Sequence, residues 1–304
     1  MLTREDTAAT ETILDKRNLH ALGVLLPVRL TAISFFAGRH ALGRAGEGMR
    51  FLRTRAFEPG QDNPRDIDRF SPPGELRVNE WEAETQASIM IYADVSASMQ
   101  FVPKAALANL TLLQLTYSLW RASDRVRTTL FSAAGRDLIA RRNLKGQLEE
   151  SMSALGNGEL AVSVDPLSVL SDRARRRHRV RDDLIFMVSD FCSMEADTAG
   201  ADPAGWRDVL RKLPCDFVPA IISFELDASQ LGSIRLWDAE QQRHRMTLLT
   251  RGRIAAINAR ERERVHGLQQ LFRRLGLDCL LLRQEHDVYP ELIKLARWRR
   301  RRCA

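Results

Sequence analysis

Two aspartates and two serines stand in this sequence where their oxygen atoms can act together. Asp94 ends an apolar run and is followed by Ser96 and Ser98, while Asp190 ends a second apolar run later in the chain. Two-residue spacing in an extended loop turns the side chains of Asp94, Ser96 and Ser98 to the same side. Carboxylate and hydroxyl oxygens suit a hard cation such as Mg²⁺, which keeps several waters and takes few protein ligands.

The Asp-x-Ser-x-Ser spacing has an ordinary alternative interpretation, because small polar residues are common in turns. In that interpretation the stretch is a loop between a strand and a helix, and Ser98 caps the helix. The second strand-end aspartate, Asp190, favours the cation site over this alternative.

The elements that must position these residues follow from the apolar pattern. Continuous apolar runs predict buried strands, and helical spacing predicts helices between them. The predicted strands cover 88–94, 126–133, 182–190 and 215–224, and the predicted helices cover 104–121, 144–155, 166–177 and 203–213. Strands that are apolar on both faces and alternate with helices indicate a doubly wound α/β fold with a mostly parallel sheet. Ligands of such sheets bind outside the carboxyl ends of the strands, where Asp94 and Asp190 are expected.

The remaining segments are predicted to flank this α/β domain. Residues 1–80 are expected to form an N-terminal helical segment and a strand-and-loop appendage, and 81–304 the main domain. Near 233–250 two half-alternating stretches around a polar turn predict a hairpin. A long arginine-rich helix over 251–275, a last short strand and a terminal helix are expected to follow.

The composition indicates a globular protein of 304 residues, 44% of them hydrophobic, with a net charge of +7. The four cysteines are widely spaced and lie mostly in apolar runs, which is typical of reduced core thiols rather than of disulfides or a zinc site. The polar start of the chain does not resemble a signal peptide, so a cytoplasmic location is expected.

One segment, 21–38, is apolar enough to raise the question of a membrane. Pro27 and Arg29 lie near its centre, and an arginine there opposes insertion. We therefore expect a docked helical hairpin or an interfacial helix, and membrane contact stays open.

Two arginine runs, 173–181 and 297–302, are dense enough to neutralise several phosphates. A basic nucleic-acid-binding protein is therefore the alternative function. Trp298 is the one aromatic residue in either run, so base stacking is poorly supplied, and solvated faces or faces for an acidic partner are favoured.

Several stretches resemble a known family. SIMIYADVSASM, the helix after it and FMVSDF resemble the metal-ion-dependent adhesion site of a von Willebrand factor A-like domain. RTRAFEPGQDNPRDIDRF, LRVNEWEAE and ERERVHGLQQLFRRLGLDCLLLR resemble the bacterial domain-of-unknown-function 58 family, over about 43–297. Members are typically encoded beside MoxR-type AAA+ ATPases, some in gene clusters that mature metal- or cofactor-dependent enzymes such as methanol dehydrogenase. The resemblance implies a protein-binding adaptor that works with such an ATPase.

The resemblance also assigns site residues. Asp94, Ser96 and Ser98 match the first motif of the adhesion site, and Asp190 matches its last aspartate. The middle motif usually contains a threonine, but the corresponding stretch 154–165 has none, and Glu159 or Ser163 is the candidate substitute. The implied Mg²⁺ would then bind tightly, weakly, or only when a partner supplies an acidic oxygen.

The loop PGQDNPRDIDRF also matches the family, with Arg69 where a tryptophan is usual. Its candidate partner-binding residues are Asp62, Arg65, Asp66 and Asp68. The favoured alternative is a salt-bridged turn that fastens the appendage. The aspartate spacing does not fit an EF-hand, so calcium is not expected.

Known catalytic patterns do not occur in the sequence. It contains no G-x-x-x-x-G-K-[ST] loop, no G-x-S-x-G elbow and no histidine near Ser96 or Ser98. A metal-dependent hydrolase that uses Asp94 and Asp190 would still need a base or nucleophile. We therefore expect a protein that is not an enzyme.

Overall fold

The computed structural model describes residues 40–45, 51–85, 87–122, 124–132, 135–141, 143–156, 164–175, 183–192, 203–213, 215–227, 231–238 and 243–303. The predictions for 21–38, for Glu159 and Ser163, and for most of the run 173–181 lie outside these residues.

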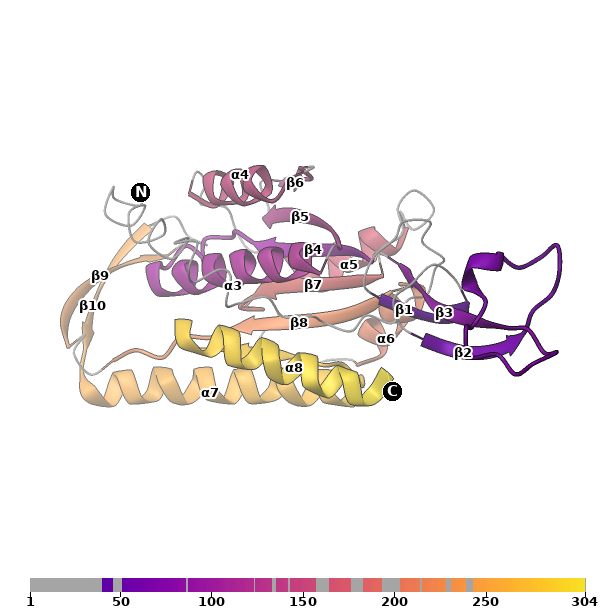
Figure 1. Cartoon of the computed structure of the whole chain (residues 1–304). Helices are drawn as coiled ribbons and strands as arrows, with labels where there is room; N and C mark the ends of the chain where they lie inside the picture. Colours follow the sequence, from indigo (N-terminus) through magenta and orange to yellow (C-terminus); the bar gives the residue numbers. More distant parts are fainter. Residues whose placement is uncertain are drawn as a thin grey trace.

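A six-stranded sheet forms the centre of the molecule (Figure 1), in the order β11-β8-β7-β4-β5-β6. Its strands are β4 (Ser88–Asp94), β5 (Arg125–Ser132), β6 (Gly135–Ile139), β7 (Leu184–Ser189), β8 (Asp216–Ile222) and β11 (Leu280–Leu282). All neighbours are parallel except β5 and β6, which are antiparallel. The predicted α/β fold with a mostly parallel sheet is confirmed.

Helices cover both faces of this sheet. They are α3 (Val102–Arg121), α4 (Leu144–Gly156), α5 (Pro166–Arg175), α6 (Pro203–Lys212), α7 (Arg251–Arg274) and α8 (Val288–Cys303). The side chains of β4 alternate between two cores, because successive residues of a strand face opposite ways. Ile89 and Ile91 pack with α3 and α8, whereas Met90 and Tyr92 pack with α5, α6 and α7. The continuous apolar character of β4 is the sequence signature of this double burial.

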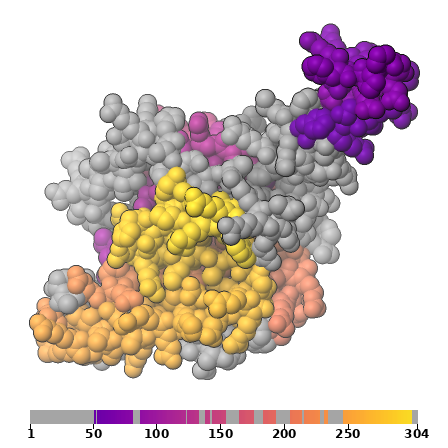
Figure 2. Space-filling view, turned by 60° about the horizontal axis from the view of Figure 1, so that its bottom comes forward, coloured from indigo at the N-terminus to yellow at the C-terminus, as the bar shows by residue number. Residues whose placement is uncertain are grey.

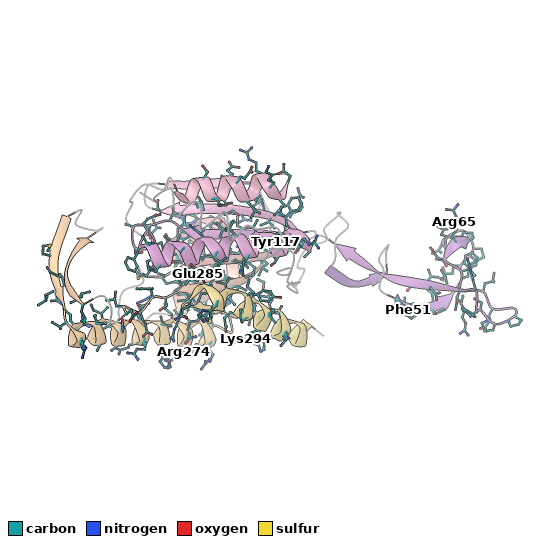
Figure 3. All side chains as sticks on the ribbon, turned by 60° about the vertical axis from the view of Figure 1, so that its left-hand side comes forward. Phe51, Arg65, Tyr117, Arg274, Glu285 and Lys294 are labelled. Atoms are coloured by element: carbon teal, nitrogen blue, oxygen red, sulfur yellow. The ribbon has the colours of Figure 1, made fainter. Side chains whose placement is uncertain are left out.

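A second sheet forms an arm that stands away from the body (Figures 2 and 3). Its antiparallel strands are β1 (His40–Ala45), β2 (Phe51–Ala56) and β3 (Arg77–Thr85), in the order β1-β3-β2, with a short 3-10 helix, η1 (Pro64–Asp66), in the loop between β2 and β3. The predicted boundary at residue 80 falls inside strand β3. The arm sheet ends with this strand at Thr85, just before the main sheet begins with β4 at Ser88.

Two aspartates hold the root of the arm, at the amino end of β4. The Ala87 N–H donates to Asp124 Oδ1 at 3.2 Å, and the Ser88 N–H donates to Asp183 Oδ2 at 2.7 Å. Both carboxylates are buried, so these bonds are shielded from water. The start of β4, on the body side of the arm, is therefore held firmly in the body.

The predicted hairpin is formed by β9 (Gly232–Asp238) and β10 (Arg243–Leu249), which pair antiparallel from Gly232↔Leu249 to Asp238↔Arg243. Thr250 then caps α7, because its Oγ1 accepts a hydrogen bond from the Arg253 N–H. The last elements described are a further 3-10 helix, η4 (Glu285–Asp287), and α8. Helix α8 lies beside α7 on one face of the body (Figure 2). Within the described ranges, no helix combines the length and the hydropathy needed to cross a bilayer.

Candidate functional site

Asp94 and Asp190 meet at the carboxyl edge of the central sheet. Asp94 is the last residue of β4, and Asp190 follows β7, which is the parallel neighbour of β4. Both carboxylates are almost fully buried, with 4% of Asp94 and none of Asp190 exposed. The strand order thus brings together two residues that are far apart in the sequence.

Hydroxyl and amide groups surround the Asp94 carboxylate. Its Oδ1 accepts a hydrogen bond from the Ser96 N–H at 2.9 Å, and its Oδ2 accepts one from Ser189 Oγ at 2.6 Å. The hydroxyls of Ser96 and Ser98 lie 3.2 Å apart. Ser98 is not the cap of α3, because Phe101 holds that position. The two serine hydroxyls therefore face each other inside the loop.

Burial and the neighbouring Asp190 carboxylate raise the pKa of Asp94 to about 6. The hydrogen bonds from Ser189 and Ser96 favour the ionised form but do not offset this effect. A carboxylate held in this way is typical of functional sites, where charge is kept in spite of its cost to folding.

Lys104, in the first turn of α3, supplies a positive charge to the site. Its Nζ lies 2.8 Å from Asp190 Oδ2, and only 15% of its side chain is exposed. Burial by itself would lower the pKa of Lys104, but the Asp190 carboxylate outweighs burial and holds that pKa above its ordinary value. Burial would likewise raise the pKa of Asp190, and Lys104 outweighs it, so that pKa lies below its ordinary value. Asp190 is therefore ionised and paired with an ammonium group.

Helix α7 supports the loop that carries Asp190. The Arg264 guanidinium donates to the Asp190 backbone carbonyl and pairs with Glu261 at 2.7 Å. Phe191 has a φ of 54°, a left-handed conformation that is rare for a bulky residue, and its ring packs edge-on against Phe272 of α7 at 5.5 Å. These contacts fix the direction in which Asp190 points.

Apolar side chains lie on the surface beside the buried charges. Phe101 is 43% exposed and Val102 is 59% exposed, both at the start of α3. Phe224, which follows the carboxyl end of β8, packs against Phe101 with ring centroids 5.1 Å apart. The edge thus combines buried polar groups with exposed apolar side chains, a combination that protein-binding surfaces use.

The residues match Mg²⁺ in donor type but not in charge. Asp94, Ser96 and Ser98 offer the oxygens that Mg²⁺ prefers. Asp190, however, already pairs with the Lys104 ammonium, and Asp94 Oδ2 already accepts from Ser189. As arranged here the site does not fit a divalent ion, and the expected Mg²⁺ stays a prediction. In the described part of the chain no three His, Cys, Asp or Glu side chains cluster as a metal site would require.

Comparison with protein families decides what kind of chain this is. The model of the family described as "Protein of unknown function DUF58" matches residues 53–264. The chain belongs to the DUF58 family. The predicted family is thereby confirmed, and the match includes Asp94, Lys104 and Asp190. A search of curated proteins gives no match for this DUF58 chain.

Solved structures give weaker likenesses to this DUF58 protein. An aerotolerance-related membrane protein from Bacteroides fragilis is 11% identical over 71% of this chain and 99% of its own, with a TM-score of 0.40. The pilus adhesin SpaC from Lactobacillus rhamnosus GG is 12% identical over 70% of this chain and 30% of its own, with a TM-score of 0.43. The minor pilin PilB from Streptococcus sanguinis is 10% identical over 75% of this chain and 66% of its own, with a TM-score of 0.41. No function is taken from these structures.

In the arm of this DUF58 protein, Asp62 takes part in an ion-pair cluster. Arg55 Nη2 lies 2.5 Å from Asp62 Oδ1, and Arg55 Nε pairs with Glu80, which also pairs with Arg53 at 2.7 Å. The Arg55 guanidinium holds the pKa of Asp62 below its ordinary value. This cluster ties the loop after β2 to β3, so these ion pairs hold the loop within the arm rather than fastening the arm to the central sheet.

The other candidates in the arm loop do not join that cluster. The Arg65 N–H donates to Asn63 Oδ1, and Asp68 Oδ1 accepts from the Phe70 N–H at 3.1 Å, so both stabilise the turn. Arg65 lies at the far end of the arm (Figure 3), and Asp66 is exposed within η1. The structure thus places these four residues away from Asp94.

The terminal arginine run of the DUF58 chain is partly internal. Arg299 is 3% exposed, pairs with Asp216 and lies 3.6 Å from Asp278 Oδ2. An arginine held by two carboxylates cannot also neutralise a phosphate, which weakens the nucleic-acid alternative.

Sequence reasoning missed three contributors to the site: Lys104, Ser189 and Arg264. Ser189 directly precedes Asp190, and its place at the strand end was the one available signal. Lys104 and Arg264 lie on helices, where nothing in the local pattern distinguishes them from surface charges.

Proposed function

We propose that this DUF58 protein is a non-enzymatic adaptor that binds a protein partner at the carboxyl edge of its sheet. The observation that carries the proposal is the buried Asp94–Asp190–Lys104 cluster beside the exposed Phe101 and Val102. Buried charge provides specificity, and the adjoining apolar surface provides favourable burial when a partner covers it.

Binding explains the arrangement better than catalysis does. Ser189 Oγ donates to the Asp94 carboxylate, and the hydroxyls of Ser96 and Ser98 contact each other, so the hydroxyl groups are engaged within the site. Asp94 and Asp190 are almost fully buried, whereas Phe101 and Val102 are exposed and Lys104 is partly exposed. We therefore assign the contact with the partner to these exposed side chains, with Asp190 holding Lys104 in place.

The partner that we propose is a MoxR-type AAA+ ATPase in the cytoplasm. The support is the family resemblance, since such ATPases are the usual genetic neighbours of DUF58 proteins. The proposed role is the assembly or maturation of a protein complex or a metal- or cofactor-dependent enzyme, with the adaptor holding the client or the ATPase. In this role the strand-edge loops that carry Asp94 and Asp190 contact the partner, at the place where the matched motif lies in an adhesion site.

The test is an affinity pull-down from native lysate with the full chain, in Mg²⁺ or in chelator, followed by mass spectrometry. Asp94→Ala is expected to lose an AAA+ ATPase or its client that the wild type retains. Asp208→Ala is the matched control, because Asp208 is an exposed aspartate on α6 at a distance from the site. Equal retention by Asp94→Ala and wild type would remove the strand edge as the binding site.

A further inference from the structure

Lys104 is placed against the usual preference for charges on a helix. It lies in the first turn of α3, where the helix dipole is positive and disfavours a cation. Its side chain is nevertheless drawn inside, with 15% exposed, to meet Asp190 at 2.8 Å. The Asp190 carboxylate must therefore offset both the dipole and the burial of the ammonium.

We propose that Lys104 is the built-in cation of the strand-edge site and excludes divalent metal from it. Its ammonium neutralises Asp190, so that a partner is received without metal, and a divalent ion binds well only when the Lys104 ammonium is removed by substitution. The inference concerns the same site as the proposed function and rests on it for its biological meaning. Metal binding can be measured without any partner, however, so the two proposals can fail separately.

The argument for exclusion starts from electrostatics. An ion that reached the Asp94, Ser96 and Ser98 oxygens would share Asp190 with an ammonium only 2.8 Å from one of its oxygens. Like charges at such distances repel strongly inside a protein, where water screens them poorly. The Asp190 carboxylate is thus already paired with the Lys104 ammonium, and the Asp94 carboxylate already accepts a hydrogen bond from Ser189 Oγ.

The ammonium also has capacity left for a ligand. An ammonium carries three N–H donors, and the one hydrogen bond of Lys104 within the described residues goes to Asp190. Its remaining donors can reach an oxygen of an entering group, because the side chain is not fully covered. The chemical class that fits is a carboxylate or carbonyl oxygen of a protein partner.

The experiment compares divalent-ion binding by the full chain in four forms: wild type, Lys104→Gln, Lys104→Met and Lys104→Arg. Mn²⁺ is followed by electron paramagnetic resonance, and Mg²⁺ by calorimetry. Wild type and Lys104→Arg are expected to bind weakly, because both keep the positive charge. Lys104→Gln and Lys104→Met are expected to bind at least about tenfold tighter, since the repulsion is gone.

Two further variants make the result specific. Lys145→Met removes an exposed lysine of α4 whose ion pair within the described residues is with Glu149, and it should bind as weakly as wild type. Adding Asp94→Asn to Lys104→Gln should abolish the gained affinity, which locates the ion. Lys104→Gln keeps a hydrogen-bond donor for Asp190. Its ion affinity can therefore be measured even if Lys104→Met does not fold.

The proposal is overturned if wild type binds Mg²⁺ as tightly as Lys104→Gln. It is also overturned if the gained affinity survives Asp94→Asn. Partner retention that needs Mg²⁺ would also overturn the proposal, because the partner is then not received without metal.

Discussion

Asp94 is a carboxylate that the fold keeps at a cost in stability. Burial and Asp190 raise its pKa from 3.8 to about 6, so the folded protein binds a proton more readily than the unfolded chain does. The contribution of Asp94 to the free energy of unfolding is therefore fully present below about pH 4, where the carboxyl is protonated. This contribution is lost as the pH rises through about 6 and the buried group ionises. Residues that reduce stability in this way are common where function requires the charge.

Asp94→Asn is accordingly expected to stabilise the protein at pH 7, by on the order of 2 kcal/mol, because the buried charge is removed while its shape is kept. At pH 4, where Asp94 is mostly protonated in the folded state, the gain should shrink to near zero. Urea denaturation at the two pH values measures the difference, with Asp208→Asn as the surface control. A gain of equal size at both pH values would contradict the pKa that burial imposes on Asp94.

At the scale of single elements, helix α7 contacts both the apolar core on one face of the sheet and the loop that carries Asp190. Phe272 is fully buried, and its ring meets both Phe191 of the site loop at 5.5 Å and Trp206 of α6 at 5.7 Å. Arg264, two turns earlier on the same helix, holds the Asp190 carbonyl. One helix therefore fixes both the core and the loop geometry.

Phe272→Ala should lower the free energy of unfolding by about 3–5 kcal/mol, because it removes a large buried ring and leaves a cavity. Ile257→Ala, on the same helix but 39% exposed, should cost far less and is the control. Denaturant unfolding of both variants measures this difference. Similar losses for the two would mean that α7 does not depend on this aromatic cluster.

The strands that are buried on both faces gave the clearest sequence signal, and the hairpin of β9 and β10 was also predicted, but one edge strand was missed. Strands β4, β7 and β8 read as continuous apolar runs because helices cover both sides of them. Strand β6 (Gly135–Ile139) escaped prediction, since a short, mixed antiparallel strand at the sheet edge lacks that pattern. Asp94 and Asp190 were found because strand ends are visible in sequence, whereas Lys104 joins them only through the packing of α3, 86 positions from Asp190.

At the scale of the whole molecule, the arm and the body are held together by different interactions. The body rests on two apolar cores, whereas the described arm residues show ion pairs around Arg55 and few buried apolar side chains. Phe51, Phe70 and Leu76 of the arm are all more than half exposed. Changes in the arm should therefore leave the body intact.

Arg55→Met is expected to speed hydrogen exchange of the loop over 57–76, because that loop loses its tie to Asp62 and to Glu80. The melting temperature of the body should not change. Exchange followed by mass spectrometry tests both expectations. Arg77→Met is the control, since the ion pair of Arg77 in the described part of the chain is with the exposed Glu75. A cooperative loss of protection throughout β4 would show that arm and body form one folding unit.

The root of the arm has a consequence for geometry. The arm joins β4 at Ser88, while the Asp94 cluster lies at the other end of the same strand, so the length of the sheet, roughly 20 Å, separates them. Asp124 and Asp183 hold this end of β4 against the starts of the neighbouring strands, so β4 itself separates the arm from the cluster. Two proteins that occupied the two ends at once would be tethered to one molecule, and the effective concentration of each for the other would rise.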